Sequence, residues 1–75
     1  MNINTFYTWL VEQRDRQDGT GDLGKFFYEN DDVPDHKTKY SLLNYLVWKT
    51  EYDPVLLEAF DKAWIEYKRY RTLIF

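Results

Sequence analysis

A short run of carboxylates and glycine is the first place where the sequence could support chemistry. The run contains Asp15, Asp18, Gly19 and Asp22. Its composition is similar to that of a calcium-binding loop, in which carboxylates and a turn glycine keep fixed positions. With Gly19 as the turn glycine, however, Arg14 and Arg16 would occupy the first and third ligand positions. Lys25 would stand at the twelfth position, which needs a bidentate carboxylate, so we expect a solvated acidic loop.

The other reactive residue types are too few for a catalytic or metal site. His36 is the only histidine and Ser41 the only serine, and the chain has no cysteine. One imidazole beside the carboxylates of a loop is too little for a dedicated transition-metal site. Nothing near Ser41 in the sequence supplies a base and an oxyanion hole. We expect no catalytic residue, no metal and no cofactor, and we interpret the chain as a protein that is not an enzyme.

A glycine turn between two predicted helices is one candidate for contact with nucleic acid. The turn is Gly19-Thr20-Gly21, whose backbone N–H groups could face a phosphate. Asp18 and Asp22 flank it and would repel that phosphate at short range. This turn therefore gives little support to nucleic-acid binding.

A basic cluster near the C-terminus is the second candidate for contact with nucleic acid. It consists of Lys68, Arg69 and Arg71. Cations at this place also complement the dipole of a helix that ends there. The net charge of -3 and the isoelectric point near 5.0 argue against a protein that holds nucleic acid mainly by neutralising phosphates. A nucleic-acid-associated regulator that uses these three residues is the alternative hypothesis.

Length and composition indicate one small domain with an aromatic core. The chain has 75 residues, of which 20% are aromatic, and each buried ring removes about 150–250 Å² from water. A chain of this length has room for one core and for no second domain. Neither a secretory signal nor a run of about 18 apolar residues is visible. We expect a cytoplasmic protein that does not associate with a membrane.

The spacing of the apolar residues predicts four helices and no strand. The helices are expected at residues 5–14, 22–30, 38–49 and 54–70. Asp53 followed by Pro54 marks the start of the last helix, as an N-cap and a proline at the first helical position. Residues 15–21 contain two of the three glycines and are predicted to form a loop. Four amphipathic helices with short loops predict an all-α four-helix bundle.

The apolar stripe of each helix predicts its contribution to the core. We expect one core formed by Trp9, Phe27, Leu43, Phe60 and Trp64. In the third helix, Tyr40, Leu43, Leu46 and Val47 share one face, which we expect to be buried. Leu42, Tyr45 and Trp48 lie off that stripe, so one group or the other is expected to be incompletely covered.

Aromatic and apolar residues beside the core stripes suggest a surface for a partner. The candidates are Tyr45, Trp48, Tyr7 and Ile65. Tyr and Trp are enriched at the hot spots of protein interfaces, although a small bundle also leaves some rings partly exposed without any partner. Our leading hypothesis is an interaction module that binds another protein, or a second copy of itself, through such an aromatic patch.

Short motifs along the chain resemble one known family. They are Phe6-Tyr7-x-Trp9-Leu10, Gly21-Asp22-Leu23, Val33-Pro34, Tyr45-Leu46 and Phe60-Asp61-x-Ala63-Trp64-x-x-Tyr67. Their order and spacing are similar to those of the YozE-like family of small bacterial proteins. The resemblance implies a SAM-like fold, in which two helical hairpins pack crosswise, and it implies no activity and no site. Gly24 departs from the family pattern, which more often has alanine there.

Overall fold

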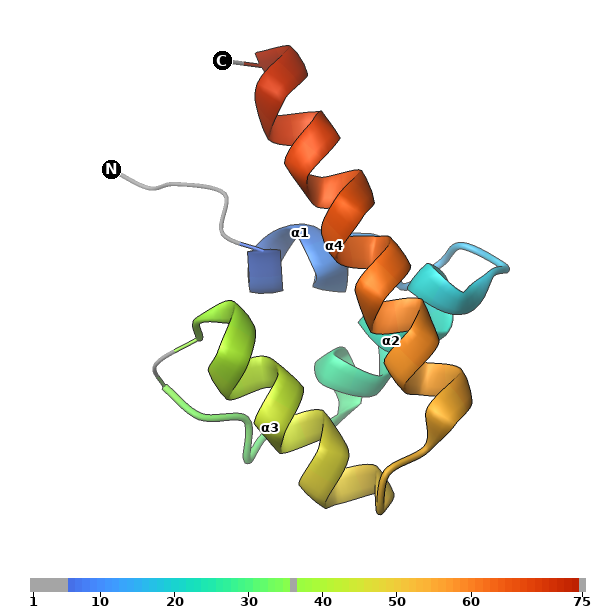
Figure 1. The fold of residues 1–75 in the computed structure, drawn as a ribbon, viewed down its shortest axis with the longest axis vertical. Coiled ribbons are helices and arrows are strands. Elements are labelled where there is room, and N and C mark those ends of the chain that lie inside the picture. Colours follow the sequence, from blue (N-terminus) through green and yellow to red (C-terminus); the bar gives the residue numbers. More distant parts are fainter. Residues whose placement is uncertain (1–5, 36, 75) are drawn as a thin grey trace.

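The computed structural model describes residues 6–35 and 37–74, and every regular element among them is a helix. The helices are α1 (Phe6–Glu12), α2 (Gly19–Glu29), α3 (Lys39–Thr50) and α4 (Pro54–Ile74) (Figure 1). The predicted all-α class with four helices is therefore confirmed. Within the described residues, no helix is both long and apolar enough to cross a membrane.

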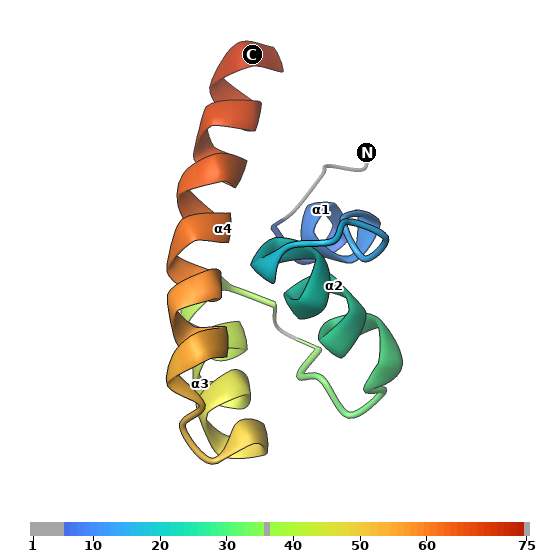
Figure 2. The ribbon, with the colours of Figure 1, turned by 90° about the vertical axis from the view of Figure 1, so that its right-hand side faces the viewer.

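The helices form two pairs that share one core. α1 packs on α2, and α3 leads through a tight turn into α4, the longest helix with 21 residues. This pairing agrees with the expected two helical hairpins. Figure 2 shows α4 along one edge of the molecule, with the other three helices to one side of it. Because α4 contacts all three, its inner face organises the core while its outer face stays in solvent.

Aromatic side chains build the centre of the core. Phe6 lies edge-on to Phe60 and to Trp64, with ring centroids 5.4 and 5.0 Å apart. The predicted core residues that are buried are Trp9, Phe27 and Phe60. Leu43 and Trp64 join this cluster as predicted, and both are half-buried at its edge. Both lie towards the side of their helices rather than at the centre of the buried face.

α2 begins inside the segment that was predicted to be a loop. It starts at Gly19, and Asp18 is the N-cap, whose Oδ1 accepts a hydrogen bond from the backbone N–H of Gly21 at 2.9 Å. A Cβ atom at Gly21 would lie only 1.9 Å from the carbonyl oxygen of Arg16. Glycine is therefore needed here for a close approach of two backbone segments within a helix, and it does not mark a loop.

α3 buries a different face from the predicted one. Of the predicted stripe only Leu46 is buried, together with Leu42 and Tyr45, whereas Tyr40 is 69% exposed. The expectation that Tyr45 belongs to a surface patch is therefore wrong. Its hydroxyl donates a hydrogen bond to Oδ1 of Asp32 at 2.5 Å, which gives the polar end of the ring a partner. Burial, followed by this hydrogen bond, raises the pKa of Tyr45 above its ordinary value of 10.0, so the hydroxyl stays a donor.

α4 extends beyond its predicted end at residue 70. It continues to Ile74, because no glycine or proline stops it. Tyr70 still contacts α1, with 6.3 Å between its ring centroid and that of Trp9. The following turn projects past the other helices (Figure 1), and Leu73 is 87% exposed.

Candidate interaction surfaces

The outer side of α3 carries two exposed aromatic rings. At about 100° per residue, Tyr40 and Val47 point about 150–170° away from the buried face, and Trp48 points about 110° away from it. The exposed fraction is 69% for Tyr40 and 68% for Trp48, while Val47 is half-buried. Asn44 is exposed and lies one turn from each ring. We call Tyr40, Asn44, Val47 and Trp48 the α3 outer face.

Lysine side chains help to orient both rings. Nζ of Lys39 lies 5.5 Å from the ring centroid of Tyr40, and Nζ of Lys49 lies 5.5 Å from that of Trp48. Lys49 is itself held by Oδ2 of Asp32 at 2.9 Å. Cation–π contacts of this kind contribute about 0.5–1 kcal/mol at exposed sites. The rings are thus positioned by their neighbours while most of their surface faces solvent.

The four residues predicted for the partner surface do not form one patch. Trp48 is exposed, but Tyr45 lies buried beside it with ring centroids 6.1 Å apart, so it supports the surface from below. Tyr7 is half-buried on α1, and Ile65 is 48% exposed on α4. Tyr40 is an exposed ring on the outer side of α3 that the sequence analysis did not assign to the surface. Its only signal in the sequence was that α3 is apolar on two sides, so that one of them had to be incompletely covered.

The three basic residues near the end of α4 lie on two sides of that helix. A shallow groove of about 500 Å³ is lined by Ile65, Lys68, Arg69, Thr72 and Leu73. Arg71 lies about 160° around the helix from Arg69. Its guanidinium group lies over the ring of Tyr67, 5.8 Å from the centroid. The three cations therefore spread around about 160° of the helix, with Lys68 between the two arginines, and do not form one compact patch.

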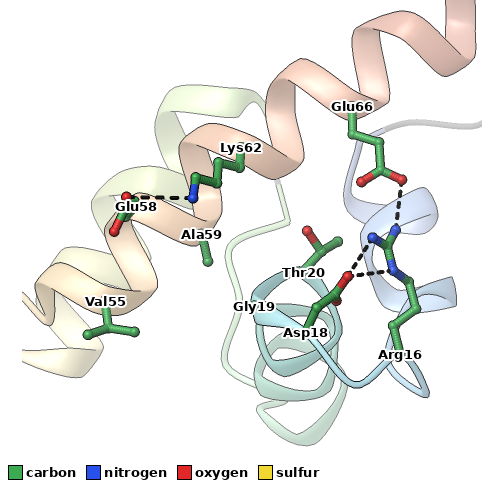
Figure 3. Close-up of a pocket in the computed structure, with 9 residues that line it drawn as sticks. All are labelled: Arg16, Asp18, Gly19, Thr20, Val55, Glu58, Ala59, Lys62 and Glu66. Carbon is green, nitrogen blue, oxygen red and sulfur yellow. Dashed lines mark hydrogen bonds and ion pairs between the residues drawn. The ribbon is translucent and has the colours of Figure 1, made fainter.

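A second groove, of about 430 Å³, lies between the start of α2 and α4 (Figure 3). Arg16 stands at its rim and bridges Asp18 and Glu66, with nitrogen–oxygen distances of 2.7 Å to each carboxylate. The hydrogen bonds to these two carboxylates raise the pKa of the Arg16 guanidinium, and the one to Glu66 has the larger effect. The hydrogen bond from the backbone N–H of Gly21 lowers the pKa of Asp18 below its ordinary value of 3.8, and the hydrogen bond from Arg16 lowers it further.

Asp18 therefore remains ionised and engaged, which suits a structural clamp better than proton transfer. The clamp fastens the connection between α1 and α2 to α4. Asp18 also occupies the N–H of Gly21 that a phosphate would need. Among the described residues, no group of three or more His, Cys, Asp or Glu side chains could hold a metal ion. His36 lies outside the described residues.

Most of the chain takes part in a single family match. A family model described as YozE SAM-like fold matches residues 5–69. The chain belongs to the YozE SAM-like family. The match confirms both the resemblance and the SAM-like fold that it implied. No curated protein and no solved structure matches the chain.

Of the two candidate surfaces of this YozE SAM-like chain, one lies inside the residues that the family model matches and the other extends beyond them. The α3 outer face lies inside the matched region, whereas Arg71, Thr72 and Leu73 follow it. Family membership therefore accounts for the scaffold that presents Tyr40 and Trp48. It assigns no chemistry to either surface.

Proposed function

We propose that this YozE SAM-like chain is a non-enzymatic module that binds another protein through the α3 outer face. The proposal depends on one observation, the exposure of two large rings on a single helix face, 69% for Tyr40 and 68% for Trp48. Tyr and Trp are enriched at interface hot spots because they bury a large area at a small loss of side-chain entropy. The cytoplasmic location expected from the sequence is part of this proposal.

The surroundings of the two rings suit the rim of an interface. Lys39 and Lys49 lie beside the rings, and the exposed Asn44 lies between them. Protein interfaces commonly combine an apolar centre with a polar rim of this kind. A partner that covers the rings would exclude water from the two cation–π contacts and strengthen them.

Nucleic-acid binding through Lys68, Arg69 and Arg71 is the second candidate, supported by the exposure of all three side chains. Two observations weaken it. Arg69 and Arg71 point about 160° apart around the helix with Lys68 between them, and the groove beside Lys68 and Arg69 is partly lined by Ile65 and Leu73, which offer nothing to phosphates. The net charge of -3 adds a general repulsion. Protein binding is therefore the better-supported function.

The test compares the proteins captured by the tagged chain with those captured by a Tyr40→Ser/Trp48→Ser variant, from an extract of the source organism. Both rings are largely exposed, so the variant is expected to melt within a few degrees of the wild type. Tyr28→Ser is the matched control, because Tyr28 is 60% exposed on α2. Partners that bind the wild type and this control should be lost with the double variant.

A parallel extract treated with nuclease separates the two candidate functions. Capture that survives nuclease and requires Tyr40 and Trp48 supports the protein-binding module. Capture that is abolished both by nuclease and by Lys68→Ala/Arg69→Ala supports the nucleic-acid alternative. If the double variant captured the same proteins as the wild type, the α3 outer face would not be the binding surface.

A further inference from the structure

A continuous exposed surface runs along the whole of α4. It lies opposite the buried side chains of Ala59, Phe60, Ala63 and Tyr67, and Figure 2 shows this side of the helix along the free edge of the molecule. From the exposed residues on this side, which also include Pro54, Lys62 and Thr72, we define seven as the α4 outer face. They are Val55, Glu58, Asp61, Ile65, Lys68, Arg69 and Leu73. The first and last lie at one edge of the face, and the others point about 125–175° away from the buried side.

The charges on this face change sign along the helix. Glu58 and Asp61 lie in its N-terminal half, and Lys68 and Arg69 lie in its C-terminal half. Counted along the sequence, Glu58 and Arg69 lie six and five residues from residue 64, and Asp61 and Lys68 lie three and four residues from it. A second α4 that runs in the opposite direction therefore places Arg69 against Glu58 and Lys68 against Asp61. A parallel second helix would instead place like charges together.

The apolar residues follow the same symmetry. Val55 and Leu73 are equally far from residue 64, and they are 72% and 87% exposed. In the antiparallel pair, Val55 of one copy meets the groove of about 500 Å³ beside Leu73 of the other. Ile65, which is 48% exposed, lies next to the symmetry axis. Apolar contacts thus occupy the centre and both ends, and the ion pairs lie between them.

We propose that two copies of this chain associate through the α4 outer face, as a two-fold symmetric dimer with antiparallel α4 helices. Each contact then occurs twice, as in other isologous interfaces. The face is one helix wide and about 27 Å long, so the dimer buries less than the ~1,200 Å² of a standard stable interface. Its association is therefore weak, and salt screens its exposed ion pairs. This interface shares no residue with the α3 outer face and does not depend on the function proposed for that face.

Contacts within one chain leave the charges of the α4 outer face available. Nζ of Lys62 approaches Glu58 only to 3.6 Å, and both side chains are more than 70% exposed. An exposed pair of this kind contributes little and can exchange for a better partner. Among the described residues, no ion pair engages Asp61, Lys68 or Arg69.

Sedimentation velocity over a concentration series, at about 50 mM and about 500 mM salt, tests the interface. Arg69→Glu places like charges together at both symmetric positions and should weaken dimerisation at least about tenfold. Adding Glu58→Arg exchanges the two charges and should restore the dimer. Arg71→Glu is the matched control, because it makes the same change of charge on the same helix but off the face. It should dimerise like the wild type.

The wild type is expected to form more dimer as its concentration rises and less dimer at high salt. Asp61→Lys with Lys68→Glu repeats the charge exchange at the second pair, and thermal melts verify that each variant is folded. A wild type that stays monomeric up to about 1 mM overturns the proposal, as does an Arg69→Glu variant that associates normally. Loss of the dimer in Tyr40→Ser/Trp48→Ser would also overturn it, since association would then belong to the α3 outer face. Retention of the dimer in that variant supports the proposal.

Discussion

Gly24 lies where the backbones of α1 and α2 come close together. A Cβ atom at this position would lie 2.3 Å from the carbonyl oxygen of Leu10 and 3.0 Å from the backbone nitrogen of Arg14. Helix propensity alone favours Gly24→Ala by up to about 1 kcal/mol, but two backbone atoms cannot move aside independently. We expect the substitution to lower the free energy of unfolding by about 1–3 kcal/mol in urea denaturation.

Gly19→Ala is the control for this prediction in the same helix. Its Cβ would meet only the Cβ of Ala59, at 3.1 Å, and a shift of a few tenths of an ångström relieves the contact. We expect the free energy of unfolding to change by no more than about 0.5 kcal/mol. A Gly24→Ala variant as stable as the wild type would show that α1 and α2 can separate without loss.

Tyr40 and Tyr45 show what residue types leave undecided. Both are tyrosines on α3, and the sequence pattern allows either of them in the core. Asp32 favours the burial of Tyr45, because its carboxylate accepts a hydrogen bond from the Tyr45 hydroxyl and also forms an ion pair with Lys49. No spacing rule connects a loop aspartate with a helical tyrosine 13 residues later. The exposed ring of Tyr40 could therefore not be assigned to the surface from the sequence.

At the scale of the elements, the start of α2 depends on Asp18. The backbone N–H of Gly21, and then Arg16, hold the pKa of Asp18 below its ordinary value of 3.8. A lowered pKa means that the ionised carboxylate stabilises the fold. This contribution is complete above pH 3.8 and is lost as the pH falls through the folded-state pKa. Asp18→Asn keeps a good N-cap but does not titrate, so its Tm should fall less than that of the wild type between about pH 5 and about pH 2.

Asp18→Ala separates the cap from the charge. It removes both the hydrogen bond to Gly21 and the ion pair with Arg16, so its Tm should be lower than that of Asp18→Asn at neutral pH as well. Thermal melts of the three proteins across the pH range make the comparison. Parallel curves for the wild type and Asp18→Asn would show that the charge of Asp18 does not stabilise the fold.

Elements with local signals were predicted better than elements shaped by packing. α4 starts at Pro54 as predicted, and Oδ1 of Asp53 accepts a hydrogen bond from the N–H of Val55 at 3.0 Å. α3 was placed within one residue at each end, but its buried face was wrong because the helix is apolar on two sides. The start of α2 was missed because its glycines serve a backbone contact. Of the α3 outer face, only Trp48 was predicted.

At the scale of the whole molecule, the two outer faces give one small domain two separate surfaces. The α3 outer face is aromatic, and the α4 outer face changes from acidic to basic along the helix and is self-complementary. A dimer formed through α4 carries two α3 outer faces, so a partner with two matching sites would gain from effective concentration without any new contact. The all-α class followed from the sequence. The position of each surface could not be predicted from the sequence alone, because tertiary contacts determine which side of each helix is buried.

The end of α4 shows how far the core extends along the longest helix. Tyr67 is only 4% exposed, and Tyr70 still contacts Trp9, whereas Leu73 in the following turn is 87% exposed. A chain that ends at Tyr70 is therefore expected to keep its free energy of unfolding within about 0.5 kcal/mol of the full chain in urea denaturation. A chain that ends at Glu66 is the control. It loses both tyrosines and should lose at least about 3 kcal/mol, enough to unfold much of so small a domain. A comparable loss in the chain ending at Tyr70 would show that residues 71–75 support the core.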